Sequence, residues 1–158
     1  MFLEFFTWGG WYVTLGTYLD TVLHATGVQI GLAYSALAIA TILSPFITGI
    51  LADRFFAAQK LLGVLHLAGA ALLYCMVMVT DAGMFYWVLL LYSLLYAPTL
   101  ALVNSISFKQ MKEVSKEFAF IRVFGTVGWI ASGWIIDKWF HLEAEELGFT
   151  FKLSAVSA

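Results

Sequence analysis

Charged residues are scarce in this sequence. Asp, Glu, Lys and Arg make up 11% of its 158 residues, whereas soluble domains carry about a quarter. Hydrophobic residues account for 62%, and the formal net charge is only −2. This composition excludes an ordinary soluble domain, and the absence of a basic stripe argues against nucleic acid as a partner. We therefore predict a membrane protein.

The residue patterns that carry catalysis or bind metals are also missing. Cys75 is the single cysteine, so the chain has no internal disulfide and no cysteine cluster. There is no Ser/His/Asp or Cys/His arrangement, no phosphate-binding glycine loop and no group of metal ligands. His66 lies alone among leucines and glycines, which is more typical of a packed or hydrogen-bonded core residue than of a ligand. We expect no catalytic residues, no metal and no cofactor, and hence no enzyme.

Long apolar runs are what the sequence does contain. A bilayer core about 30 Å thick is crossed by a helix of ~20 apolar residues. Five runs of this kind are present, and a sixth begins near Lys152. The five span residues 2–19, 29–52, 60–79, 84–107 and 118–136. They predict an all-α polytopic membrane protein with five complete transmembrane helices and the start of a sixth, truncated within helix six.

Basic residues in the loops predict the orientation of these helices. Arg54 and Lys60 follow the second run, and Lys109, Lys112 and Lys116 follow the fourth, whereas the first and third loops contain neither Lys nor Arg. Because cytoplasmic loops are enriched in Lys and Arg, the second and fourth loops should be cytoplasmic. The N-terminus is then cytoplasmic as well.

Small residues recur along one side of the second run, at Gly31, Ser35, Ala38, Pro45 and Gly49. In lipid, small residues allow helix backbones to approach closely. The stripe predicts a helix-packing face, and it is equally compatible with a helix that moves against its neighbour.

Arg122 is the one charged residue in the fifth run. A charge near the middle of a bilayer costs about 2.5–3.5 kcal/mol on insertion scales. Gly125, Thr126 and Trp129 lie at i+3, i+4 and i+7 on the same helix face. This face predicts a cavity for a small organic ligand, to which guanidinium supplies donors and indole a stacking surface. The alternative is that Arg122 reaches the headgroups and Trp129 only packs.

Glu4 is the other charge within an apolar run, and Trp8 follows it at i+4. A medium of low dielectric constant favours the neutral form of a carboxylate, whereas a nearby arginine favours the charged form. A glutamate that can meet or leave Arg122 is therefore a candidate for proton coupling. The alternative is an interfacial glutamate at the edge of the bilayer.

The fourth run places Tyr96 and Thr99 on one helix face, beside Pro98. Proline has no N–H to donate to the helix, so a local kink is expected here. Tyr96 lies too deep in the run for a role in the aromatic belt at the membrane surface. We predict that Tyr96 and Thr99 contribute to the same cavity.

The loop after the second run resembles a family motif. The segment GILADRFFAAQK, residues 49–60, is similar to the cytoplasmic loop of the major facilitator superfamily, in which Gly49, Asp53 and Arg54 match the pattern. The later glycine and basic pair of that pattern are absent. Three further stretches, TWGGWYVTLGTYL, YAPTLALVNSISF and IRVFGTVGWI, resemble the nucleoside:proton symporter branch of the superfamily. The resemblance covers nearly the whole chain.

The resemblance implies a transporter of two six-helix halves around a substrate site at the midplane. Residues 1–158 would be the N-terminal half, truncated within helix six, and the C-terminal half would be absent. Arg122, Thr126 and Trp129 match cavity positions of the fifth helix, where relatives typically have phenylalanine at the last position. Glu4 replaces an amide side chain, so its proton role rests on the physical argument alone. Asp53 and Arg54 are expected to stabilise one facing of the transporter.

We therefore predict nucleoside transport, coupled to protons, by alternating access in a cell inner membrane. The expected partners are a nucleoside, a proton, the lipid bilayer and the missing C-terminal half. The predicted substrate-binding residues are Arg122, Thr126, Trp129, Trp8, Tyr96 and Thr99. Two alternatives remain open at this point: a major facilitator transporter of another polar solute such as a sugar, and a membrane scaffold that transports nothing.

Overall fold

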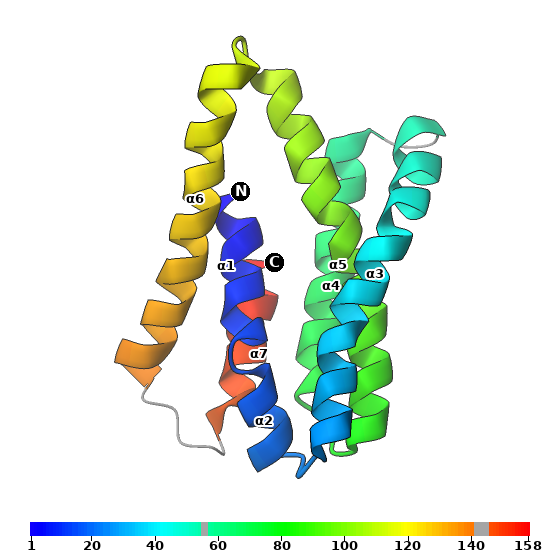
Figure 1. The fold of residues 1–158 in the computed structure, drawn as a ribbon, viewed down its shortest axis with the longest axis vertical. Coiled ribbons are helices and arrows are strands. Elements are labelled where there is room, and N and C mark those ends of the chain that lie inside the picture. The colour runs from blue at the N-terminus through cyan, green and yellow to red at the C-terminus, as the bar shows by residue number, and fades with distance from the viewer. Residues whose placement is uncertain (55–56, 141–145) are drawn as a thin grey trace.

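The structure is a computed structural model that describes residues 1–54, 57–140 and 146–158, with only the backbone described for 47–54 and 139–140. The described part of the chain is helical, with short connections (Figure 1). Its elements are α1 (Phe2–Tyr12), α2 (Leu15–Thr21), α3 (Gly27–Arg54), α4 (Ala58–Met76), α5 (Ala82–Gln110), α6 (Val114–Ile135), the π-helix η1 (Ile136–Phe140) and α7 (Gly148–Ser157).

Four helices are long and apolar enough to cross a membrane. They cover Gly27–Phe46, Ala58–Met76, Ala82–Gln110 and Val114–Lys138. The first predicted span, residues 2–19, is formed by two consecutive helices, α1 and α2, with a break at residues 13–14. Neither is long enough to span a bilayer alone, although together they reach Thr21. The all-α, multi-pass membrane architecture is thereby confirmed.

Two sequence predictions about helix detail need correction. The last helix begins at Gly148, four residues before the predicted start at Lys152, because the apolar residues of its first turn pack in the core: Phe151 is fully buried. The small-residue stripe of α3 is not the buried face. Gly31 and Ala38 are exposed, whereas Ala36 and Ala40 are fully buried.

The helices form two groups, which meet mainly where α4 packs against α7. In one group, α3 and α4 pack against α5; in the other, α6 and α7 pack against α1; α4 also contacts α7. Figure 1 shows α5 and α6 joined by a turn at one end of the bundle and diverging from there. The chain's first residue lies part of the way along α6, so α1 begins deep in the bundle. In the first turn of α1, Glu4 is buried against other helices, whereas Phe2 and Leu3 are exposed.

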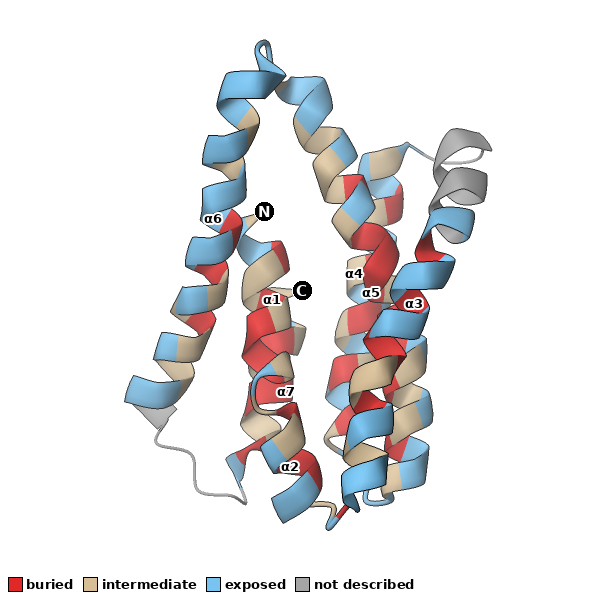
Figure 2. Ribbon diagram, viewed as in Figure 1, coloured by how far each residue is buried: buried red, intermediate tan, exposed pale blue. Residues whose placement is uncertain are grey.

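The core joins α1, α2, α5 and α7 through large aromatic side chains. Trp11 and Tyr92 are almost or completely buried, with ring centroids 5.5 Å apart. Phe151 packs on Tyr18 and Phe85, with centroids 4.9 and 5.8 Å away. Figure 2 shows α6 exposed along most of its length, in contrast to these buried helices.

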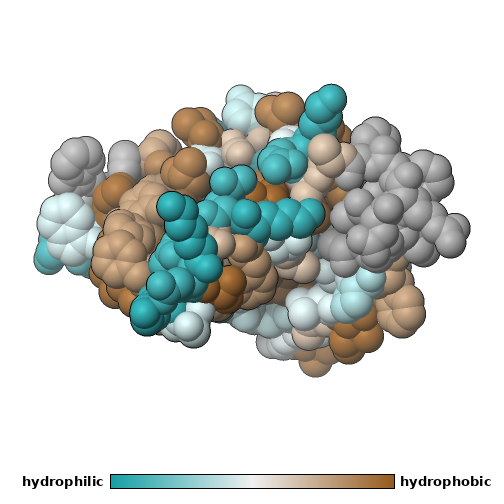
Figure 3. All heavy atoms as spheres, turned by 90° about the horizontal axis from the view of Figure 1, so that it is seen from above, coloured by the Kyte–Doolittle hydropathy of each residue, from teal (hydrophilic) through white to brown (hydrophobic). Residues whose placement is uncertain are grey.

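One end of the bundle is more hydrophilic than its sides. The exposed Lys109, Lys112 and Lys116 lie around the α5–α6 turn. Seen from above, hydrophilic side chains gather across the middle of this face and hydrophobic ones lie around them (Figure 3). The last turn of α3 and the first turn of α4 are at the same end (Figure 1).

Candidate functional site

Glu4 lies in the first turn of α1 and is 4% exposed. Its Oε2 is 3.0 Å from Nε2 of His66 on α4, and its Oε1 accepts a hydrogen bond of 2.6 Å from the Thr99 hydroxyl on α5. The Tyr96 hydroxyl donates to the Glu4 carbonyl oxygen over 2.7 Å. A buried carboxylate needs such partners, because burying an unpaired charge is costly. One glutamate thus connects three helices.

Tyr96 and Thr99 are 3% and 1% exposed, and both are directed at Glu4. Helix α5 continues through Pro98, which is itself buried. The predicted proximity of Tyr96 to Thr99 is therefore present, and their hydroxyls hold Glu4. The Tyr96 ring also contacts the Trp8 ring, at a centroid distance of 6.2 Å.

Arg122 and Thr126 are exposed on α6. The Arg122 guanidinium carbon lies 4.8 Å from the centroid of the Phe5 ring, an arrangement that is attractive because a ring face is electronegative. The sequence raised the hypothesis that Glu4 can meet or leave Arg122; in this structure Glu4 is paired with His66. Phe5 and Glu4 are adjacent on α1, so their side chains point in different directions around the helix.

Glycines determine how closely α6 approaches α1. A Cβ at Gly128 would overlap the backbone carbonyl of Phe2, and one at Gly125 would press against the Phe5 ring. Both glycines are buried. We call the close contact of α6 with α1 at Gly125 and Gly128 the α1–α6 seam. Arg122 and Trp129 lie beside this seam on α6, and their side chains extend along the edge of α1.

Trp8 and Trp129 meet at this edge, with ring centroids 5.2 Å apart and planes at 86°. Tyr12 lies 6.1 Å from Trp129 and 5.2 Å from Tyr34 of α3. We call Trp8, Tyr12, Tyr34 and Trp129 the aromatic cluster. Nε1 of Trp8 is buried and has no hydrogen-bond partner among the described residues. The cluster therefore offers ring surfaces and, in Trp8 Nε1, a buried donor without a partner among the described residues.

The loop-motif residues Gly49, Asp53 and Arg54 lie at the end of α3, and their side chains are outside the described part of the structure. Among the described residues, no group of three or more His, Cys, Asp or Glu side chains is arranged to hold a metal ion.

Sequence reasoning missed His66, Tyr12 and Tyr34. His66 looked isolated because its partner Glu4 is 62 positions away on another helix. Tyr12 follows Trp8 at i+4 and could have been found by that spacing. Tyr34 carries no local signal, because its hydroxyl acts across helices by accepting a hydrogen bond of 3.1 Å from the Gly16 N–H.

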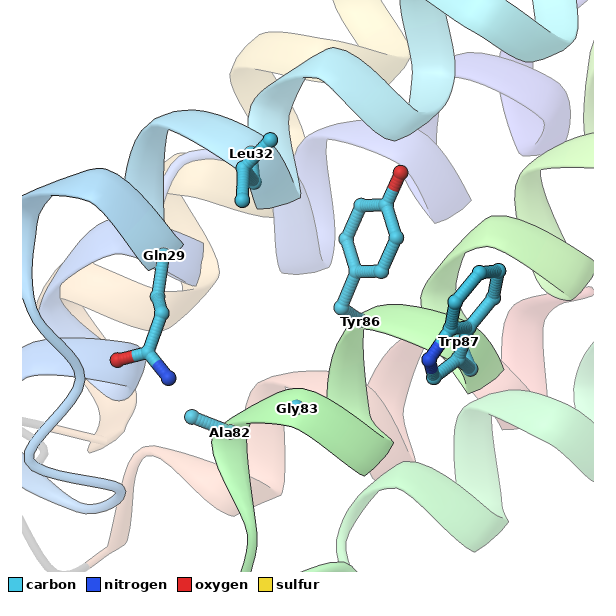
Figure 4. Close-up of a pocket in the computed structure, with 6 residues that line it drawn as sticks. All are labelled: Gln29, Leu32, Ala82, Gly83, Tyr86 and Trp87. Carbon is cyan, nitrogen blue, oxygen red and sulfur yellow. The ribbon is translucent and has the colours of Figure 1, made fainter.

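A shallow pocket lies elsewhere, between α3 and the start of α5. Gln29, Leu32, Ala82, Gly83, Tyr86 and Trp87 line it (Figure 4). Ten positions separate Tyr86 from Tyr96, which is about 15 Å along a helix. The pocket is thus separate from Glu4 and its partners on α5, and none of its lining residues belongs to the aromatic cluster.

Comparison with known proteins supplies the family. Residues 1–155 match the family model described as "Nucleoside H+ symporter". YegT of Escherichia coli (strain K12) is 50% identical over 133 residues, which are 84% of this chain and 31% of YegT. The xanthosine permease of the same strain is 41% identical over 150 residues, covering 92% of this chain and 36% of the permease.

The fold agrees with a solved transporter. The crystal structure of the nucleoside transporter NupG superposes with a TM-score of 0.88 at 35% identity, over 99% of this chain and 40% of that one. NupG of Escherichia coli (strain K12) is 35% identical in sequence, and the chain covers 38% of its length. The chain thus spans between three and four tenths of the length of the curated relatives it matches. Because the family model extends over nearly every residue and the helices follow those of NupG, this chain belongs to the nucleoside H+ symporter family.

Proposed function

We propose that this chain forms the N-terminal helical half of a proton-coupled nucleoside transporter. Its family membership supports this proposal, as do the names of its relatives, a xanthosine permease and a nucleoside permease. The relatives are more than twice as long as the matched segment, so a C-terminal half is the expected partner. The proposed function is transport without chemical conversion of the substrate. The proposed location is a bacterial inner membrane.

The proposed nucleoside site lies at the edge between α1 and α6. A nucleoside has a planar base and a ribose with hydroxyls, and small-molecule sites combine apolar ring surfaces with a few polar groups. Trp8 and Trp129 supply the rings, and Trp8 Nε1 supplies a buried donor without a protein partner among the described residues. Arg122 and Thr126 are exposed on the same helix face as Trp129 and supply a cation and a hydroxyl.

The proposed proton site is Glu4. Intramembrane ionisable residues are expensive to bury and commonly serve proton or substrate pathways. Glu4 is one helical turn from Trp8, and Tyr96 contacts both residues. Tyr96 and Thr99 are therefore proposed to contribute to the site indirectly, through their hydrogen bonds to Glu4 and the contact of Tyr96 with the Trp8 ring. The observation that carries the proposal is this adjacency of a buried carboxylate to an aromatic cluster with an unpaired donor.

Alternating access requires a second half that rocks against the first. Helix α6 presents exposed hydrophobic side chains, among them Phe124, Val127 and Ile130, which lipid or the second half would cover. Because cytoplasmic loops are enriched in Lys and Arg, we propose that the end with the α5–α6 lysines faces the cytoplasm, and that the N-terminus is cytoplasmic as well. Asp53 and Arg54 at the same end are proposed to stabilise one of the two conformations, inward-facing or outward-facing, of the transporter.

Labelled uridine uptake tests the proposal. The full-length transporter is expressed in cells that lack their own nucleoside permeases, with and without a proton uncoupler, beside Arg122→Ala at matched membrane expression. We expect the uncoupler to abolish accumulation and Arg122→Ala to reduce uptake at least tenfold. Ala131→Ser, a small change on the same helix, is the control: it should leave uptake unchanged if the loss in Arg122→Ala is specific to the arginine.

Other outcomes would redirect the assignment. Uptake inhibited by a sugar and not by nucleosides would indicate a different solute on the same fold. Normal membrane expression without uptake of any nucleoside or sugar would leave family membership as a statement about fold and favour a scaffold.

A further inference from the structure

Both carboxylate oxygens of Glu4 have a side-chain partner, and the two partners differ in kind. His66 Nε2 lies 3.0 Å from Oε2, and the Thr99 hydroxyl lies 2.6 Å from Oε1. The side chain of Glu4 is 3% exposed and that of His66 is 15% exposed. We call Glu4, His66 and Thr99 the carboxylate triad.

The other titratable or charged groups around Glu4 are few. Helix α5 contributes the hydroxyls of Tyr92 and Tyr96. On α6, Arg122 lies over the Phe5 ring, and α7 meets α1 through hydroxyl groups such as that of Ser157 on Thr7. Within the described part of the chain, His66 is the basic side chain within ion-pair distance of Glu4. A proton arriving at this site therefore goes to Glu4 or to His66.

Thr99 can adapt to a proton on Glu4 without moving. Its Oγ1 is 2.6 Å from Glu4 Oε1 and also 2.5 Å from the Tyr96 carbonyl oxygen. A hydroxyl has one proton to donate and can also accept, whereas a carbonyl can only accept. When Glu4 is ionised, Thr99 donates to Oε1. When Oε1 carries a proton, it donates to Thr99, and the Thr99 proton turns to the Tyr96 carbonyl.

His66 cannot adapt in the same way. Its Nδ1 is buried and has no hydrogen-bond partner among the described residues. With the proton on Nε2, the neutral ring donates to Glu4 Oε2, and Nδ1 remains an acceptor without a partner. A second proton would turn Nδ1 into a buried donor with nothing to accept it, which is unfavourable. The neutral ring therefore fits its surroundings better than the cation.

We propose that the carboxylate triad is the proton-binding site, with the transported proton on Glu4 Oε1, Thr99 reversing its hydrogen bond, and His66 remaining neutral to position Oε2. This proposal deepens the proposed function and rests on it. Proton uptake converts the carboxylate into a carboxylic acid, and the charge of the triad changes from −1 to 0. Hydrogen bonds to a neutral acid are weaker than those to a carboxylate. Protonation thus loosens α1 from α4 and α5 beside the Trp8 ring.

The test uses the purified full-length transporter in proteoliposomes, with uridine accumulation driven by an imposed pH gradient and uridine counterflow measured in parallel. The wild-type protein is measured first, because wild-type failure in pH-driven accumulation would overturn the proposed function itself. Given wild-type symport, Glu4→Gln should lose pH-driven accumulation while counterflow remains detectable. Full pH-driven accumulation by Glu4→Gln would overturn the triad.

His66→Gln separates the two possible proton carriers. Glutamine can still donate to Oε2 but does not titrate, so pH-driven accumulation should persist within about threefold of wild type. Loss of accumulation with retained counterflow would place the proton on His66 and overturn the assignment. Infrared spectroscopy supplies a second measurement: a pH-dependent band of a protonated carboxyl should remain in His66→Gln and disappear in Glu4→Gln. A band that survives in Glu4→Gln would place the proton elsewhere.

Thr99→Val tests the hydroxyl, with Thr99→Ser as the matched control. Valine removes a hydrogen bond that the carboxylate needs more than the acid does, so the neutral form gains in relative stability. The pH midpoint of counterflow should shift upward in Thr99→Val and stay near that of wild type in Thr99→Ser. Equal midpoints in all three proteins would remove Thr99 from the site.

Discussion

The two sides of helix α1 are held to their neighbours by different physics. Toward α6, the contact is one of shape, because Gly125 and Gly128 let the backbones approach until a single added carbon would overlap Phe2. Toward α4 and α5, Glu4 and its hydrogen bonds add a titratable contact to the ring contacts of Trp8 and Trp11 with α5. A contact made by shape does not respond to protons, whereas one made by a carboxylate does. A proton on Glu4 would therefore act on the α4 and α5 side of α1 and leave its glycine contact with α6 unchanged.

The strongest way to break this comparison is to add one carbon to the α1–α6 seam. Gly128→Ala should destabilise the protein by about 1–3 kcal/mol, the usual cost of overpacking, because the obstacle is backbone that cannot rotate away. Thermal unfolding of the full-length protein in detergent measures the effect as a lower melting temperature.

Gly133→Ala on the same helix is the matched control. A Cβ at Gly133 meets nothing within 4 Å, so alanine there should leave the melting temperature unchanged or raise it slightly. Equal effects at Gly128 and Gly133 would mean that glycine matters through helix propensity, not through close packing.

Trp129 tests whether the edge of the seam is also the nucleoside site. Removing an aromatic partner costs about 0.5–1.5 kcal/mol beyond its buried area, and 1.4 kcal/mol corresponds to about tenfold in affinity. Trp129→Ala should therefore weaken uridine binding about tenfold in a titration with the purified transporter.

Trp134→Ala controls for the loss of an indole from α6, because Trp134 is 56% exposed and makes none of the ring contacts of the aromatic cluster. Similar losses of affinity in both variants would argue that Trp129 acts through general packing of α6.

Tyr96→Phe weakens the opposite side of α1 without changing its shape. It removes the hydroxyl that donates to the Glu4 carbonyl oxygen, and a hydrogen bond of this kind contributes about 0.5–1.5 kcal/mol. The melting temperature should fall by less than in Gly128→Ala. Tyr74→Phe, at a side chain that is 52% exposed, should have no effect; a fall of the same size there would remove the Glu4 contact as the cause.

The smallest effect is expected where α1 and α2 meet α7. The Thr14 hydroxyl donates to that of Thr150 over 3.0 Å, and such bonds between transmembrane helices average about 0.6 kcal/mol. A double-mutant cycle with Thr14→Val and Thr150→Val should give a coupling energy of about that size by denaturant unfolding. A coupling energy larger than the destabilisation caused by Tyr96→Phe would place the strongest polar contact of α1 at α7.

Several features of the fold could be predicted because they depend on residues close in the chain. Helix length and hydropathy indicated the long spans, and the helices α3–α6 fall within a few residues of the predicted ranges. The division of the first span at residues 13–14 left no clear signal, because those residues are as apolar as their neighbours. The packing face of α3 was also misassigned: small residues occur on both of its sides, and only the neighbouring helix selects one.

The candidate site shows the same limit. Arg122, Thr126 and Trp129 could be grouped from their spacing on one helix, and the structure places Trp129 beside Trp8 from the first span. The pairing of Glu4 was not predictable, because a charge in lipid needs some partner but the sequence does not say which. Arg122 was the obvious candidate by charge, yet the packing of α1 between α6 and α5 brings His66 to Glu4 instead.

By itself, the sequence determined that this chain lies in a membrane as a set of helices, because a bilayer forces the backbone to satisfy its hydrogen bonds within each apolar segment. It also carried the family resemblance. Only the tertiary structure decided which buried groups meet, because contacts between helices depend on rotation and approach distance, which no single segment encodes. The packing of the helices brings Glu4 to His66 and Thr99. Gly125 and Gly128 on α6 contribute to this packing, because they allow the close approach of α1.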